Sequence, residues 1–138
     1  MDLRQRSRSG IILMHWAEKF LKIEYKDMNC SKFVEHVLRN QFGINYSFPQ
    51  SEGSLFNQSQ QIRDAMPSFC TKTDSPKEGD MILMHGRRRM CHVGIYVRIG
   101  ITDYVLHTES SIKTAALHPL KNLLFFGYTV EGFYTWLK

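Results

Sequence analysis

Cysteine is scarce in this sequence, and its scarcity argues against two kinds of small protein. The 138 residues contain three cysteines, Cys30, Cys70 and Cys91. An odd number at wide spacing matches neither a disulfide framework nor the paired cysteines of a zinc site. A chain of this length buries enough surface to form a core without such cross-links. We therefore expect one domain, made in a reducing compartment.

Long apolar runs are also missing. The N-terminal apolar run, Ile11–Met14, is shorter than the roughly 7–15 residues of the apolar core of a signal peptide. No stretch reaches the roughly 18 apolar residues of a membrane-spanning helix. We expect a protein made in the cytoplasm without a signal peptide and without a membrane span. If its substrate lies outside the cytoplasm, another component must deliver it.

Positive charge is in excess, but it lacks the distribution that nucleic-acid binding needs. The formal net charge is +5. Six arginines in the N-terminal tail and in one loop exceed this whole excess: Arg4, Arg6, Arg8, Arg87, Arg88 and Arg89. The remaining sequence is close to neutral and forms no continuous basic stripe, so nucleic acid is not an expected partner. The three consecutive arginines either bind carboxylates of a substrate or form a solvated loop.

The spacing of the apolar residues predicts helices first and strands afterwards. Residues 1–10 are basic and lack an apolar period, which predicts a flexible tail before one domain at 11–138. Helical spacing predicts helices at 15–23, 31–42 and 54–66. After the turn-forming residues 76–80, alternation predicts strands at 81–84, 92–99, 104–108 and 127–136. Helices ahead of an antiparallel meander are typical of the α+β class.

Cys30 lies where an irregular segment turns into the second of these helices. Phe33, Val34 and Val37 form the apolar stripe of that helix, and Cys30 extends the stripe toward the N-terminus. The N–H groups and the positive dipole end of a helix start stabilise an anion, so one interpretation of Cys30 is a thiolate nucleophile. The alternative is a buried, inert side chain, which is the common role of a lone cysteine.

Two histidines on the predicted strands supply the other groups that a nucleophilic thiol needs. His92 opens the strand 92–99 on the face that also carries Gly94, where the missing side chain allows a helix to approach closely. A short turn brings His107, in the next strand, alongside. A cysteine at a helix start and a histidine at the start of a facing strand can form a thiolate–imidazolium pair, with His107 orienting the imidazole. Each histidine alone could equally be a structural residue.

These residues together resemble motifs of the NlpC family of cell-wall cysteine peptidases. The segment Asp27–Ser31, DMNCS, followed by an apolar helix, resembles the family's DCSGLV-type nucleophile motif. The segment His92–Tyr96, HVGIY, resembles its base motif, and Pro76–Asp80 resembles the lead-in to its first core strand. There are departures: two residues separate Asp27 from Cys30, Lys32 replaces the usual glycine, and the glycine-rich loop before the nucleophile is absent.

The resemblance implies a papain-like α+β fold in which Cys30 is the nucleophile, His92 the base and His107 the orienting residue. It also implies cleavage of stem-peptide amides in bacterial peptidoglycan, typically between D-glutamate and a diamino acid, with no cofactor. Tyr25 matches a family tyrosine near the oxyanion site, and it could equally be a packing aromatic. By resemblance we expect a phage tail component or an exported effector, with phage tail or secretion-apparatus proteins as partners.

Other functions remain open from the sequence. A thioester intermediate can be captured by an amine or a hydroxyl instead of water, so an amidase or an acyl or peptidyl transferase is an alternative on the same scaffold. A non-catalytic cell-wall or structural phage component is an alternative of another class. Cys91 beside His92 suggests zinc, but neighbouring strand residues point to opposite faces, so no metal site is expected. Cys91 is then a packing residue, and Cys70 lies in a loop without a predicted partner.

Overall fold

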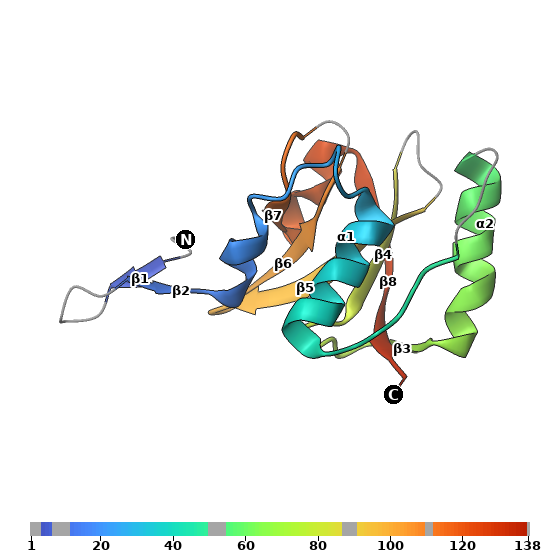
Figure 1. Cartoon of the computed structure of the whole chain (residues 1–138), viewed down its shortest axis with the longest axis horizontal. Coiled ribbons are helices and arrows are strands. Elements are labelled where there is room, and N and C mark those ends of the chain that lie inside the picture. Colours follow the sequence, from blue (N-terminus) through green and yellow to red (C-terminus); the bar gives the residue numbers. More distant parts are fainter. Residues whose placement is uncertain (1–3, 7–11, 50–54, 87–90, 110–111, 138) are drawn as a thin grey trace.

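The computed structural model of the protein describes residues 4–6, 12–49, 55–86, 91–109 and 112–137 (Figure 1). In chain order the elements are β1 (Arg4–Arg6), β2 (Ile12–Met14), η1 (Trp16–Phe20), α1 (Cys30–Val37), η2 (Leu38–Phe42), α2 (Leu55–Ala65), η3 (Met66–Ser68), β3 (Cys70–Thr73), β4 (Met81–Gly86), β5 (His92–Ile99), β6 (Thr102–His107), β7 (Ala116–Pro119), η4 (Leu120–Phe126) and β8 (Tyr128–Trp136). Helices precede most of the strands, which confirms the α+β class.

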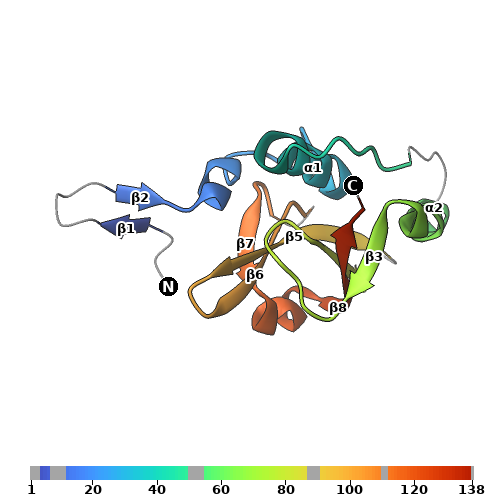
Figure 2. The same cartoon turned by 90° about the horizontal axis from the view of Figure 1, so that it is seen from below.

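The main sheet has the strand order β3-β8-β4-β5-β6-β7, and each pair of neighbours is antiparallel. Figure 2 shows α1 on one side of this sheet and the orange-red turns of η4 on the other. Val93 and Ile95 of β5 pack in the core that contains α1, whereas Tyr96 packs with Val105 and Leu123 in a second core beneath η4. The alternating side chains of β5 therefore pack in two different cores, one on each face of the sheet.

The helix that begins at Cys30 has an explicit N-terminal cap. The Asn29 side chain accepts a hydrogen bond from the backbone N–H of Lys32 at 3.1 Å, which satisfies one of the first-turn donors. Phe33, Val34 and Val37 are fully buried, as the apolar stripe predicts. After α1, the α-helical hydrogen-bond pattern changes to the wider π-helical turn of η2, which is capped by Gly43 with a φ of +66°. The helical region thus covers the predicted range 31–42.

Two strands of the main sheet and the helix η4 were not predicted from the sequence. β3 is short and mostly polar, and it is a strand because it pairs with β8 from Cys70↔Trp136 to Thr73↔Phe133. β7 lies at the other edge of the sheet, where all its residues are partly exposed and no alternation develops. η4 is an apolar run that ends at Gly127, whose φ is +82°. The prediction that Cys70 lies in a loop is wrong, because Cys70 opens β3.

The N-terminal residues contain more regular structure than the sequence predicts. Residues 1–10 were expected to form a flexible tail, but Arg4–Arg6 pairs in antiparallel fashion with Ile12–Met14. Figures 1 and 2 both show this two-stranded hairpin projecting away from the main sheet and α1. Within the described parts of the chain, no helix has both the length and the apolar character needed to cross a membrane.

Candidate active site

Cys30 is the first residue of α1, and a bond to β6 fixes the segment that leads into it. The Cys30 side chain is buried, with 7% of its surface exposed. Thr108, directly after β6, donates its hydroxyl hydrogen to the carbonyl oxygen of Met28 at 3.0 Å. Thr108 is itself fully buried. This bond holds the start of α1 at the end of the sheet where β5 begins and β6 ends.

Three histidines form a hydrogen-bonded row at the same end of the sheet. His92 Nε2 lies 2.7 Å from His107 Nδ1, and His107 Nε2 lies 2.9 Å from His118 Nδ1. The rings of His92 and His107 are fully buried, whereas His118 is half-buried. The row crosses three neighbouring strands, because β5 pairs with β6 and β6 pairs with β7. The structure therefore brings together the two histidines singled out in the sequence, and adds a third.

The cysteine and the histidines reach this end of the sheet from different faces. Cys30 packs in the core beneath α1, together with Cys91 and Val93, the two chain neighbours of His92. The His92 ring instead stacks on Tyr128, a member of the core beneath η4. The Thr108–Met28 bond crosses from the strand end to the helix start. A thiol and an imidazole that are to react must therefore meet at this end of the sheet, where β5 begins at His92.

Tyr128 supports the His92 ring and was not identified from the sequence. The two rings lie nearly parallel, with centroids 4.5 Å apart and planes 20° from each other. Gly86, opposite Tyr128 in the β4–β8 pair, leaves room for the tyrosine, because a Cβ there would lie 3.1 Å from the Tyr128 ring. The β4–β8 register brings Gly86 and Tyr128 opposite each other, and sequence spacing does not reveal this register.

The absence of a side chain at Gly94 makes space for His107 on the neighbouring strand, and not for a helix as the sequence predicted. We expected a helix to approach Gly94, but its close neighbours lie on β6. A Cβ at Gly94 would overlap Cγ2 of Val105 and lie 3.2 Å from Cβ of His107. The missing side chain therefore lets β6 place His107 beside His92.

Burial keeps the inner part of the row uncharged. Loss of solvent lowers the pKa of His107 to about 3, and the neighbouring His118 acts in the same direction. Burial also lowers the pKa of His118 below its ordinary value, although the negative charge of Glu109 opposes this effect. At neutral pH, His107 and His118 are therefore neutral rings, each with one N–H donor and one nitrogen acceptor. A neutral His107 is suited to orienting another imidazole.

Tyr25 lies in the irregular segment before Cys30. Its backbone N–H donates to the carbonyl of Lys113 at 2.9 Å, and its half-buried side chain helps to line a cavity of about 350 Å³ with Glu24 and Ile112. A contribution of the Tyr25 hydroxyl to the reaction stays a prediction. The arginines proposed for substrate binding, Arg87, Arg88 and Arg89, lie outside the described residues.

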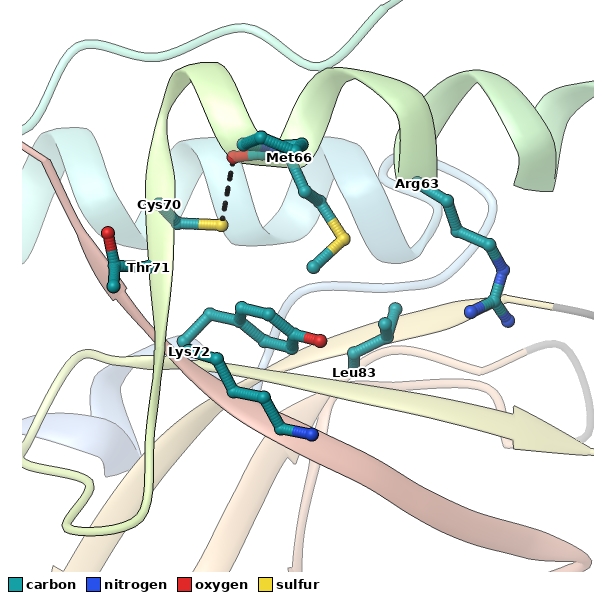
Figure 3. Close-up of a pocket in the computed structure, with 8 residues that line it drawn as sticks. Arg63, Met66, Cys70, Thr71, Lys72 and Leu83 are labelled. Atoms are coloured by element: carbon teal, nitrogen blue, oxygen red, sulfur yellow. Dashed lines mark hydrogen bonds between the residues drawn. The ribbon is translucent and has the colours of Figure 1, made fainter.

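The other two cysteines are packing residues. Cys91 is buried in the core beneath α1, as predicted. Cys70 donates its thiol hydrogen to the carbonyl of Met66 at 3.4 Å. Figure 3 shows this thiol at the end of the helical segment, beside a cavity of about 440 Å³ that Leu83 and Tyr134 also line. Burial raises the pKa of Cys70 to about 11, so this thiol stays protonated at neutral pH and is a poor nucleophile.

The histidine row does not have the geometry of a metal site. Ring nitrogens that lie 2.7 and 2.9 Å apart share a proton, and such a pair leaves no space for an ion between its members. Over the described ranges, no group of three histidine, cysteine or acidic side chains is arranged to hold a metal.

Comparison with known proteins gives one match, at the level of the family. The model of the NlpC/P60 family matches residues 16–125, which is most of the 138-residue chain. The matched range begins at η1 and includes Cys30 and all three histidines of the row. Searches of curated proteins and of solved structures found no match.

Proposed function

Because the chain belongs to the NlpC/P60 family, we propose that it hydrolyses stem-peptide amide bonds of bacterial peptidoglycan through Cys30, His92 and His107. Proteins of this family are cysteine hydrolases of the cell-wall peptidase kind. The finer assignment is an endopeptidase that cuts between D-glutamate and a diamino acid. It rests on the resemblance of the segments around Cys30 and His92 to the family's nucleophile and base motifs.

The choice of these catalytic residues rests on one observation, the buried hydrogen bond between His92 and His107. This contact is 2.7 Å long and uses Nε2 of His92, so we assign proton exchange with the thiol to Nδ1. The bond lies at the strand end to which Thr108 fastens the start of α1. A nucleophile, a base and a group that orients the base are the three parts that thiol catalysis requires.

The first half of the reaction forms a thioester. The Cys30 thiol gives its proton to Nδ1 of His92, and the sulfur attacks the amide carbonyl. The carbonyl oxygen becomes an oxyanion, which needs hydrogen-bond donors about 2.7–3.1 Å away. We assign the backbone N–H of Cys30, in the first turn of α1, as one donor and the Tyr25 hydroxyl as the candidate second. The C–N bond then breaks as His92 protonates the leaving amine.

The second half releases the peptide. A water molecule loses a proton to His92 and attacks the thioester carbonyl, and the Cys30 sulfur leaves as the carboxylate product forms. In this scheme, Nε2–H of His92 donates to Nδ1 of His107 throughout both halves, and His107 stays neutral because burial lowers its pKa. The imidazole is thereby held in one orientation while its charge changes.

Digestion of purified peptidoglycan tests the proposal. Wild-type protein should release peptides whose masses fit addition of one water at the D-glutamyl–diamino acid bond, and Cys30→Ser should release none. Thr71→Ser, a conservative change on β3, is the matched control and should digest like the wild type. Products in which an added amine replaces water would indicate a transferase. No mass change in any component of the peptidoglycan would refute catalysis.

A further inference from the structure

His118 extends the proposed catalytic row beyond His92 and His107. It lies on β7, where it pairs with Val105 of β6, and its Nδ1 contacts Nε2 of His107 at 2.9 Å. Its ring is held flat against Phe126 of η4, with centroids 4.0 Å apart and planes 14° from each other. The position of this ring is thus fixed by two neighbouring elements, and its Nδ1 is directed at His107.

A count of protons along the row shows why this contact matters. Each nitrogen–nitrogen contact needs one proton, and each neutral ring supplies one. His92 can take the thiol proton on Nδ1 only if its own proton is on Nε2, from which it donates to Nδ1 of His107. His107 must then carry its proton on Nε2, and that proton points at Nδ1 of His118. The row therefore requires an acceptor at position 118.

We propose that His118 is a positioning residue: by accepting a hydrogen bond from His107, it holds His107 in the tautomer that can accept from His92. The inference rests on the proposed role of His92 as the base. The protonated form of His92 needs the same arrangement, because its Nε2–H still donates to His107. His118 therefore supports the base before and after proton transfer.

A hydrogen-bond donor at position 118 would reverse the direction of the hydrogen bonds along the row. An N–H directed at His107 would force the His107 proton onto Nδ1, where it would face the Nε2–H of His92. His92 would then have to carry its proton on Nδ1 and could not take one from the thiol. Two effects oppose each other at His118, since burial disfavours its charged form while the negative charge of Glu109 favours it. Protonation of His118 is therefore expected to prevent His92 from accepting the thiol proton.

Two nearly isosteric variants separate an acceptor role from a packing role. His118→Asn retains an acceptor, because the amide oxygen occupies a place close to that of Nδ1, whereas His118→Leu has a similar volume and no acceptor. We expect His118→Asn to stay within about threefold of wild-type turnover on peptidoglycan. His118→Leu should lose about tenfold to a hundredfold, as is common when an outer hydrogen-bond partner of a functional histidine is removed.

Nitrogen-15 NMR of the histidine rings reads the tautomer directly, without any substrate. In the wild type and in His118→Asn, His107 should carry its proton on Nε2, and in His118→Leu the Nδ1–H form should appear. Wild-type His107 in the Nδ1–H form would overturn the inference, and so would a His118→Leu protein with unchanged His107 signals and wild-type turnover. If the wild type digests no peptidoglycan, the proposed function fails, and the spectra alone decide the role of His118.

Discussion

Acid should destabilise the folded protein through His107. The pKa of this buried ring is lowered to about 3, compared with an ordinary value of about 6.5 in an unfolded chain. Between these two values the unfolded chain binds a proton that the folded chain does not, so stability falls as the pH falls below about 6.5. From pH 7.5 to pH 5, the loss from this one ring is about 2 kcal/mol. His118, whose pKa is also lowered, adds to the loss in the same direction.

Urea unfolding followed by tryptophan fluorescence at pH 7.5 and pH 5 measures this loss. His107→Gln removes the titrating group, so its free energy of unfolding should change with pH by about 2 kcal/mol less than that of the wild type. Thr108→Val is the control, because it removes the hydroxyl bond to Met28 but no titrating group. It should cost about 1 kcal/mol at both pH values. The reasoning is refuted if His107→Gln keeps the full pH dependence of the wild type.

Three further predictions concern positions around the site and at its margins. Gly94→Ala should cost about 1–3 kcal/mol of stability by pushing β6 away and should reduce turnover, because a Cβ there overlaps Val105; wild-type stability on thermal unfolding would contradict the packing. Glu131→Gln should cost about 1 kcal/mol in urea unfolding, because Glu131 accepts two bonds from Arg63 that tie α2 to β8; no change would show that the pair contributes nothing. Deletion of residues 2–10 should leave the melting temperature unchanged, since the hairpin projects from the body, and a large drop would show that it docks.

Much of the fold could be predicted because, in its central elements, the spacing of apolar residues in the sequence matches the faces that are buried in the structure. β5 spans His92–Ile99, as the alternation predicts, since its two faces enter two different cores. The missed strands of the main sheet, β3 and β7, lie at its two edges. Edge strands are half exposed and owe their conformation to a partner strand, so the local sequence contains little evidence of them. β3 in particular depends on its pairing with β8, which lies some 60 residues away in the chain.

The site was predictable to the extent that its parts lie in local motifs. Cys30 at a helix start and His92 at a strand start can both be identified from neighbouring residues. His118 and Tyr128 could not be found in this way, because each joins the site through a strand register that only the folded sheet defines. The same holds for Gly94, whose partner proved to be a strand instead of a helix.

The relative reactivity of the three thiols tests the central claim, a thiolate–imidazolium pair of Cys30 and His92. Brief treatment with iodoacetamide at about pH 6, well below the ordinary thiol pKa near 8.5, followed by peptide mapping, reports which thiol is a thiolate. We predict that Cys30 is labelled first, that Cys70 is slow because burial raises its pKa to about 11, and that buried Cys91 is also slow. In His92→Ala, the Cys30 rate should fall toward that of Cys70. Equal labelling of Cys30 and Cys70 in the wild type, or a Cys30 rate that does not depend on His92, would contradict the pair.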